Sequence, residues 1–192
     1  MAYQAWSVVY GEQPTAAKWN ILGTNDASFN DGTGIADDAI KVATHLDNPY
    51  KFSAFLSASQ GSVASGSAQT IVFNGEKYDA EGDFDVTTGI YTVPVTGYYH
   101  FDVRWFAYYG GTASPTRVNT YFQVNGGNAA QVEQRYPAAN AGLGATLSND
   151  IYLTAGDEVK IRCAIYYSSG APYVYGDAGG VYTAFNGHLI CT

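Results

Sequence analysis

The chain has 192 residues, 46% hydrophobic and 15% aromatic, which suits one β-domain with a real core plus a short additional segment. Its 9 Lys and Arg against 17 Asp and Glu give a net charge of −8, so nucleic acid and anionic membrane surfaces are disfavoured as partners. No apolar run is long enough to cross a membrane, and no secretory signal pattern follows Met1.

Residues 1–47 are predicted to form a short, partly helical N-terminal segment. Pro14 suits the first turn of a helix and Gly23 suits its end, so residues 15–22 indicate one short helix. Helices of this length are marginal alone and need a surface on which to dock. We expect this segment to anchor the protein to a partner through the following residues: Trp6, Tyr10, Pro14, Trp19, Leu22 and Phe29.

Residues 48–192 carry the alternation that is typical of β-strands. Tyr99, Phe101, Val103 and Trp105 alternate with polar residues. Similar runs recur over 52–58, 71–73, 91–95, 118–124, 151–153, 159–165 and 181–189, with turn signals at Asn-Gly and Gly-Asp pairs between them. This pattern predicts an all-β antiparallel sandwich or jelly roll.

Several of these stretches resemble the globular head domain of the complement component one-q and tumour-necrosis-factor superfamily. Residues 88–101 read TGIYTVPVTGYYHF, and residues 183–190 read TAFNGHLI, like that family's central stretch and final strand. The sequences FSAF at 52–55, IVFN at 71–74, GDFD at 82–85 and LTAGDEV at 153–159 add to the resemblance in the same order. It covers nearly three quarters of the chain.

The resemblance implies a ten-stranded jelly roll over residues 48–192 that forms a homotrimer and acts as a binding or adhesive head, without catalytic residues. The residues expected in the core or at the three-fold interface are Phe52, Phe55, Tyr99, Phe101, Trp105, Tyr121, Phe185 and Leu189. Some family members bind calcium near the three-fold axis. Asp177 is a weak calcium candidate, because its loop lacks a run of acidic residues, so we expect no cofactor.

The start of the chain, WSVVYGEQPTAAKWNILGTND at 6–26, resembles the leader of bacteriophage fibre or tail proteins. This resemblance implies a structural or adhesive virion protein, such as a capsid decoration protein, head fibre or tail fibre, attached to the phage through residues 1–47. A bacterial cell-surface or spore-coat protein with the same head is the alternative. A host-surface glycan or protein is the expected ligand of the phage protein.

Adjacent aromatic residues near glycine-rich loops suggest where such a ligand would bind. Neighbours in a strand point to opposite faces, so each Tyr-Tyr pair places one ring outside. An outward ring near a loop suits either sugar stacking or contact with another subunit, and subunit contact is the favoured interpretation. The candidate ligand-binding residues are Tyr109, Tyr167, Tyr173 and Tyr175.

Other reactive side chains lack a catalytic or metal-binding pattern. Asp83 and Asp85 would share a strand face, which suits a calcium pair or a glycosidase dyad, but a solvated strand edge is the favoured interpretation. The three histidines lack metal-ligand spacing, and His100 is expected to face solvent or an interface. Cys163 and Cys191 suggest two buried free thiols, with a disulfide as the alternative.

Overall fold

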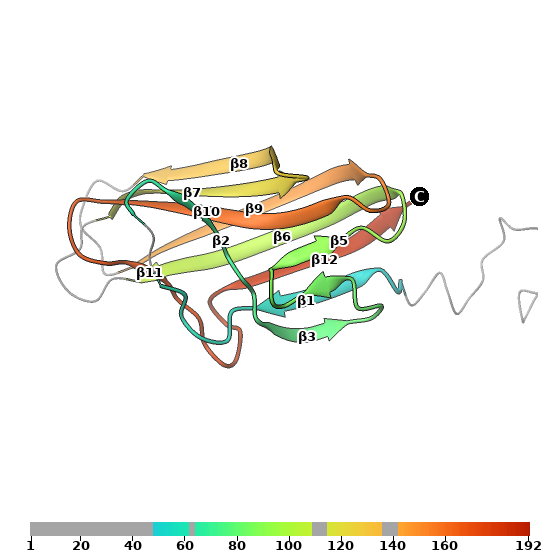
Figure 1. Cartoon of the computed structure of the whole chain (residues 1–192), viewed down its shortest axis with the longest axis horizontal. Helices are drawn as coiled ribbons and strands as arrows, with labels where there is room; N and C mark the ends of the chain where they lie inside the picture. Colours follow the sequence, from blue (N-terminus) through green and yellow to red (C-terminus); the bar gives the residue numbers. More distant parts are fainter. Residues whose placement is uncertain (1–47, 62–63, 109–114, 136–141) are drawn as a thin grey trace, which may run out of the picture. The chain divides into compact units, whose positions relative to one another are not determined.

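A computed structural model of the chain describes residues 48–61, 64–108, 115–135 and 142–192 (Figure 1). Residues Pro49–Thr192 form one compact unit by themselves. The anchor residues expected in 1–47 and the candidate ligand-binding residue Tyr109 lie outside the described residues. No helix among the described residues is long and apolar enough to cross a membrane.

The described residues form two antiparallel sheets, here called sheet A and sheet B. Sheet A has the order β11-β6-β12-β1-β3, with β9 also paired to β6, and sheet B has the order β4-β5-β10-β7-β8, with β2 also paired to β10. The strands of sheet A are β1 (Lys51–Phe55), β3 (Gly75–Asp79), β6 (Gly97–Tyr108), β9 (Gly142–Leu153), β11 (Tyr173–Val174) and β12 (Ala184–Cys191). The strands of sheet B are β2 (Ala68–Thr70), β4 (Phe84–Asp85), β5 (Ile90–Thr92), β7 (Pro115–Val124), β8 (Gly127–Arg135) and β10 (Glu158–Tyr167).

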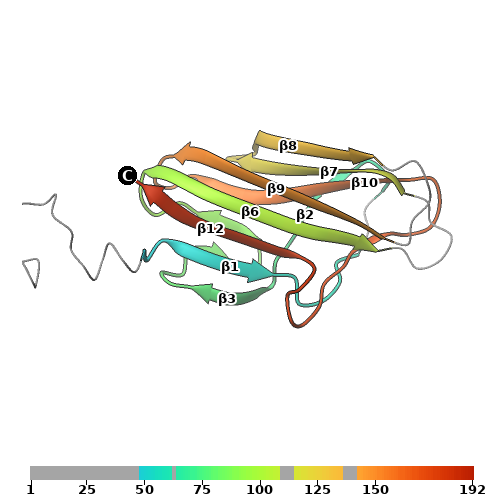
Figure 2. The ribbon, with the colours of Figure 1, turned by 180° about the vertical axis from the view of Figure 1, so that it is seen from behind.

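This arrangement confirms the predicted all-β jelly-roll sandwich. The described part of the chain has twelve strands where the resemblance implied ten, and β2, β4, β5 and β11 are only two or three residues long. Figure 2 shows β1, β12, β6 and β9 of sheet A running side by side.

The core lies between the sheets and is filled by the inward side chains of the alternating strands. In β6, Tyr99, Phe101, Val103 and Trp105 are buried while their neighbours are at least partly exposed. The Phe52 ring stacks on those of Phe84 and Tyr91, at centroid distances of 5.0 and 4.6 Å, and meets Phe185 edge-on at 4.9 Å. Aromatic contacts of this kind add to the burial of the rings in holding the two sheets together.

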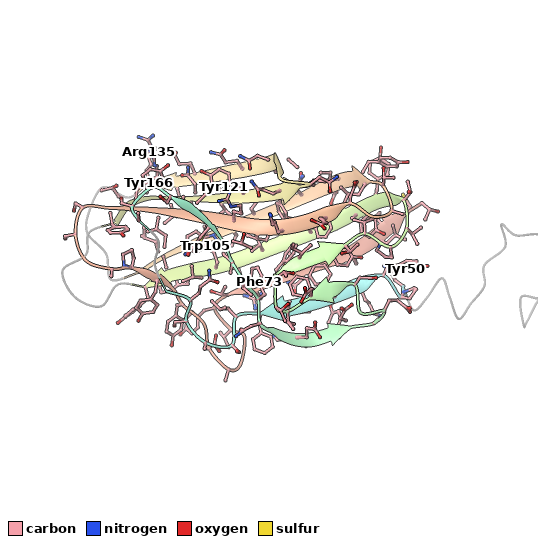
Figure 3. The ribbon with its side chains drawn as sticks, viewed as in Figure 1. Tyr50, Phe73, Trp105, Tyr121, Arg135 and Tyr166 are labelled. Atoms are coloured by element: carbon pink, nitrogen blue, oxygen red, sulfur yellow. The ribbon has the colours of Figure 1, made fainter. Side chains whose placement is uncertain are left out.

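A buried hydrogen bond joins the sheets inside this core. The indole Nε1 of Trp105 in β6, labelled in Figure 3, donates to Oγ1 of Thr120 in β7 over 2.7 Å, and both side chains are buried. The bond satisfies a polar group that would otherwise be stranded in an apolar interior.

The turn residues match the sequence pattern at two connections, the β7–β8 hairpin and the turn by which β9 of sheet A leads into β10 of sheet B. Asn125 and Gly126 join β7 to β8 with φ angles of 50° and 83°, as a two-residue hairpin turn requires. Gly156 has a φ of 92° between β9 and β10, and a carboxylate oxygen of Asp157 accepts the Thr154 N–H at 2.8 Å. These turns confirm the predicted ends of the flanking strands.

The predicted strand at 71–73 is wrong. Ile71 and Phe73 are fully buried, but the segment lies between β2, which pairs with β10 in sheet B, and β3, which pairs with β1 in sheet A. It therefore crosses from one sheet to the other, and its apolar side chains reflect burial in that crossing. Asn74 does not close a hairpin; its side-chain oxygen accepts the Ser57 N–H at 2.8 Å instead.

The last strand and β8 also differ from the sequence pattern. The last strand begins at Ala184, and Val181 lies in the preceding loop with 65% of its surface exposed. The strand β8 was not predicted because its sequence, GNAAQVEQR, is mostly polar and it forms an edge of sheet B. An edge strand buries little, so hydrophobic periodicity carries a weak signal for it.

Candidate functional site

The outer surface of sheet A is formed by the outward side chains of β1, β3, β6, β9 and β12, and is here called the A face. In β6 the outward positions are Tyr98, His100, Asp102, Arg104, Phe106 and Tyr108, because the alternate residues fill the core. The register places Tyr152 beside Tyr98, Asp150 beside His100 and Asn186 beside Asp102. Residues far apart in the sequence thus form continuous rows across this face.

The large exposed apolar side chains gather on or beside the A face. They come from β3, β6, β9 and β12 or from the loop that leads into β12. Among the described residues they are Tyr78, Tyr98, Tyr108, Tyr152, Val181, Tyr182 and Ile190, with between 38% and 65% of each residue exposed. Such a concentration on one side of a small domain is typical of a surface that contacts another protein.

One end of the A face is an exposed aromatic pair. The rings of Tyr98 and Tyr152 meet edge to face with centroids 5.1 Å apart, and each residue is more than half exposed. Ile190 of β12 is 49% exposed at the same end of the sheet, since its neighbour Cys191 pairs with Tyr98. The pair presents a rigid apolar surface with two polar hydroxyl tips.

The middle of the A face is polar, but its groups bond to one another. Ser53 Oγ donates to Asn186 Oδ1 at 2.6 Å, and Asn186 Nδ2 donates to Asp102 Oδ1 at 3.0 Å. His100 Nδ1 lies 2.6 Å from Asp150 Oδ1, and its ring centroid lies 5.3 Å from that of His188. Because these groups already have partners, covering them with another protein costs less desolvation than covering unpaired polar atoms.

The other end carries an aromatic cluster, defined as Phe106, Tyr108, Tyr173, Tyr175 and Tyr182. The Tyr108 ring centroid lies 5.6 Å from that of Tyr173 and 5.9 Å from that of Tyr175. Tyr175 meets Tyr182 edge-on at 5.0 Å, and Phe106 lies 5.9 Å from Tyr182. The two-residue strand β11, paired with the end of β6, brings Tyr173 and Tyr108 opposite each other.

The loop before β12 is held by Asp177 and Arg104. The Asp177 carboxylate accepts backbone N–H groups from Gly179, Val181 and Tyr182, at 3.0 to 3.2 Å. Arg104 donates to the carbonyl oxygens of Gly180 and Val181, at 3.0 Å each. These bonds fix the loop so that Tyr182 joins the aromatic cluster and Val181 stays exposed.

These contacts also bear on calcium. The carboxylate oxygens of Asp177 already accept hydrogen bonds from the loop, and the described residues contain no group of three or more His, Cys, Asp or Glu that could hold a metal ion. Calcium usually takes six to eight oxygen ligands. Nothing in the described chain therefore supplies the further acidic ligands that a site at Asp177 would need.

The structure separates the candidate ligand-binding tyrosines. Tyr173 and Tyr175 lie together in the aromatic cluster, whereas Tyr167 ends β10 in sheet B and packs partly against the core. The cluster adds Tyr108, Tyr182 and Phe106, which were not among the candidates. The alternation of β6 could have shown that Tyr108 and Phe106 point outward from sheet A. Nothing in the sequence places Tyr182 beside them.

The eight residues expected in the core or at the three-fold interface also fall into separate groups, most of them in the protomer's own core. Phe52, Tyr99, Phe101, Trp105 and Phe185 are at most 1% exposed in the protomer's own core, so these side chains are unavailable to a neighbouring subunit. Leu189 packs against that core, and Tyr121 faces outward from sheet B. Of the eight, Phe55 alone points to the A face, where its ring lies against Gly75 and Gly180.

The carboxylates Asp83 and Asp85 have different environments. Hydrogen bonds from Thr87 and Thr88 lower the pKa of Asp85, whose oxygens they occupy at 2.7 to 2.8 Å. Burial, with Asp79 and Glu81 nearby, raises the pKa of Asp83. The strand β4, which includes Asp85, is the edge of sheet B, where charged residues oppose pairing with another chain.

The two cysteines also differ, and both are free thiols. Cys163 is buried in the core, and this burial raises the pKa of its thiol to about 12. Cys191 is exposed at the end of β12, so the interpretation of two buried thiols is wrong for this residue. The pattern failed here because Cys191 lies where β12 leaves the sandwich and its register shifts.

Comparison with known proteins agrees with this fold. The family model of the C1q domain matches residues 52–190. No curated protein matches the chain in sequence. Similar solved structures include the globular domain of zebrafish complement 1qA protein, which is 22% identical, covers 74% of this chain and 98% of that chain, and has a TM-score of 0.49.

Two other solved structures are similar in fold at lower identity. Eiger TNF from S. frugiperda is 12% identical over 74% of this chain and 94% of that chain, with a TM-score of 0.51. Murine APRIL at pH 5.0 is 9% identical over 73% of this chain and 98% of that chain, with a TM-score of 0.54. At these identities the likeness supports the jelly-roll fold and nothing finer.

Proposed function

The chain belongs to the C1q domain family, and on this premise we propose that it is a non-enzymatic, homotrimeric binding head of a bacteriophage particle. Residues 48–192 form the head, and residues 1–47 attach it to a capsid or tail protein. In this role the protein is a structural component of the virion, as a decoration protein or fibre, and contacts a glycan or protein on the host surface.

The observation that carries the trimer is the composition of the A face. Seven large apolar side chains are exposed on or beside one sheet, and the polar groups between them bond within the protomer. An aromatic face with satisfied polar groups has the character of a subunit interface. In a closed three-fold ring this face of each copy packs against a second surface of the next copy, which leaves no open contact for further growth.

Trimerisation suits an adhesive function. Three weak binding sites on one axis share a high effective concentration, so the assembly binds a repetitive host surface far more tightly than one head. The phage assignment is supported by the fibre-like leader at 6–26, in which Trp6 and Trp19 are large apolar side chains suited to anchoring in a partner protein.

Sedimentation tests the trimer. The full-length protein is expected to sediment as a single species of three times the 20.5 kDa chain mass. The substitution Tyr152→Glu places a charge in the exposed aromatic pair of the A face and should shift the protein to monomer. The matched control Gln131→Glu adds the same charge at an exposed position of β8 in sheet B and should leave the trimer intact. A monomeric wild-type protein would refute the trimer.

Deletion tests the attachment. A phage that carries the protein without residues 1–47 should assemble particles that lack it, while the shortened protein accumulates free as a folded trimer. Immunoblotting of purified particles measures the outcome. Incorporation at the wild-type level would refute the anchor, and recovery of the native protein in bacterial surface or spore-coat fractions without particles would favour that alternative location.

A further inference from the structure

We propose that the outer surface of sheet B carries an oxyanion-binding site formed by Arg117 and Arg135 beside Tyr166. This inference deepens the proposed function by giving the binding head a ligand class, and it rests on that function only in treating the anion as part of a surface polymer. The site is separate from the A face, because its residues come from β7, β8 and β10.

Sheet B carries a local excess of basic residues on this acidic protein. Of the seven Lys and Arg in the described residues, four lie on β7, β8 and β10 of sheet B: Arg117, Arg135, Lys160 and Arg162. The same three strands carry two acidic residues, Glu133 and Glu158, so their charge is positive although the net charge of the whole chain is −8. A local positive surface on an acidic protein attracts anions to that place.

The strand register sets two positive charges opposite each other. Arg117 of β7 is paired directly with Arg135 of β8 on one side and with Tyr166 of β10 on the other. Like charges directly opposite on neighbouring strands destabilise a sheet. An acidic residue at position 135 would stabilise the sheet better than Arg135 does. The repulsion between Arg117 and Arg135 therefore costs stability, and a bound anion would relieve it.

Glu133 reduces this repulsion without cancelling it. One of its oxygens lies 3.3 Å from Arg117 Nη1, and the other accepts from Arg135 Nε at 2.5 Å. Both contacts favour the charged carboxylate, and the hydrogen bond from Arg135 is the main cause of its lowered pKa. Two guanidinium groups thus share one carboxylate, which leaves a single positive charge at the site.

The two arginines have distinct roles. The Arg117 guanidinium carbon lies 3.6 Å above the centre of the Tyr166 ring, a stacked position that fixes its orientation. Any side chain at position 66 would bring its Cβ atom within 2.8 Å of the edge of this ring, so only glycine leaves room for it. Arg135 donates from its Nε to Glu133. Its side chain is 72% exposed, so a ligand can reach the guanidinium group.

The surface is hollowed at this point. Among the described residues, Thr116, Arg117, Arg135 and Tyr166 line a depression of about 180 Å³. Figure 3 shows Arg135 and Tyr166 at the same end of the molecule. A guanidinium group binds carboxylates and phosphates through parallel N–H bonds, and one already oriented by stacking loses less entropy when it does so.

The chemistry recognised is therefore an oxyanion, and two kinds of surface polymer carry one. An acidic polysaccharide presents carboxylates, and a phosphodiester polymer presents phosphates. The stacked face of Tyr166 is occupied by Arg117. Recognition therefore depends on the charged group of the ligand more than on a sugar ring.

Titration of the full-length protein, followed by NMR of the arginine Nε–Hε groups, tests the site. At constant ionic strength, sodium glucuronate and glycerol 1-phosphate should give saturable shifts of Arg117 and Arg135, whereas glucose and sodium chloride should not. Stronger binding of glucuronate identifies the acidic-sugar source, and stronger binding of glycerol 1-phosphate identifies the phosphate source. Absence of saturation with both anions would overturn the proposal.

Two substitutions separate a specific site from general attraction. Arg135→Gln should weaken binding of the preferred anion by about tenfold, because it removes charge-assisted hydrogen bonds. The matched control Lys160→Gln removes the same charge from the same sheet, about 20 Å along β10 from Tyr166, and should change binding by less than about twofold. Equal weakening by both substitutions would overturn the proposal.

The melting temperature supplies a second readout. Arg135→Gln should leave it unchanged or raise it, since the repulsion with Arg117 is removed while Glu133 keeps a partner. A marked fall would show that Arg135 serves as a structural ion-pair partner and would overturn the argument. The mass in solution is measured separately, so loss of anion binding in an intact trimer refutes this site without refuting the trimer.

Discussion

The two outer faces of the sandwich differ, although both sheets contribute the same kind of side chain to the core. The A face exposes tyrosines and binds its polar groups to one another, as in the row from Ser53 through Asn186 to Asp102. The outer face of sheet B places Arg117 opposite Arg135 and leaves an excess of positive charge. One surface is suited to contact with protein and the other to contact with a charged ligand.

This difference shows that the fold restricts the choice of side chain only at the inward-facing positions of each strand. Inward positions must fill a shared core, so Phe101 of sheet A and Phe122 of sheet B have the same character and lie 5.9 Å apart. Outward positions have no such requirement. Their composition therefore indicates what each face contacts. Substitutions at inward positions should change the stability of the fold, and substitutions at outward positions should change binding or assembly.

The largest expected effect comes from removing a ring that both sheets share. Phe52→Ala should lower the free energy of unfolding by about 3–5 kcal/mol, because Phe52 is fully buried against Phe84, Tyr91 and Phe185. Phe55→Ala in the same strand should cost less than half as much, since this ring is only partly buried on the A face. Urea unfolding at one protein concentration measures both; equal losses would contradict the division between core and face.

A smaller effect is expected at the buried hydrogen bond between Trp105 and Thr120. Thr120→Val keeps the shape of the side chain but leaves the Trp105 N–H without its acceptor, which should cost about 1–3 kcal/mol. Thr120→Ser keeps the hydroxyl and serves as the control. Thermal unfolding checks the order, and a valine variant as stable as the serine variant would show that the bond contributes little.

The smallest effects are expected at the β4 edge of sheet B, where two carboxylates should respond to pH with opposite signs. The lowered pKa of Asp85 means that its stabilisation is present above the unfolded value, near 3.9, and is lost as pH falls through the folded value. Asp85→Asn should therefore destabilise the protein at pH 7 and have less effect in acid.

The raised pKa of Asp83 has the opposite consequence, because burial disfavours its charged form. Asp83→Asn should stabilise the protein at pH 7, by less than about 1 kcal/mol at this partly exposed site, and the gain should vanish as pH falls below the folded pKa. Urea unfolding between pH 3 and pH 7 checks both variants. Changes of the same sign would contradict the assigned environments.

Much of the head could be predicted because its strands bury one side. The alternation of Tyr99, Phe101, Val103 and Trp105 identified β6 and its core positions, and Asn125-Gly126 identified the turn that ends β7. Prediction failed where a segment's burial does not follow from its being a strand. The crossing segment at 71–73 is buried without being a strand, and the edge strand β8 is a strand with little burial.

The candidate sites were harder to predict, because they depend on neighbours from distant parts of the chain. The sequence suggested Tyr173 and Tyr175, but their association with Tyr108 requires the pairing of β11 with the end of β6. Arg117 and Arg135 carried no recognisable motif. They became a candidate site only through the register of β7 with β8 and the position of Tyr166 in β10.

By itself, then, the sequence determined the fold class and most of the inward positions, since period-two burial is a local property of each strand. Stretches such as 88–101 and 183–190 also carried the family resemblance that the family model matches over 52–190. Only the tertiary structure decided which outward residues share a face. Strand order and register are set by pairing between segments far apart in the chain, and no local pattern records them.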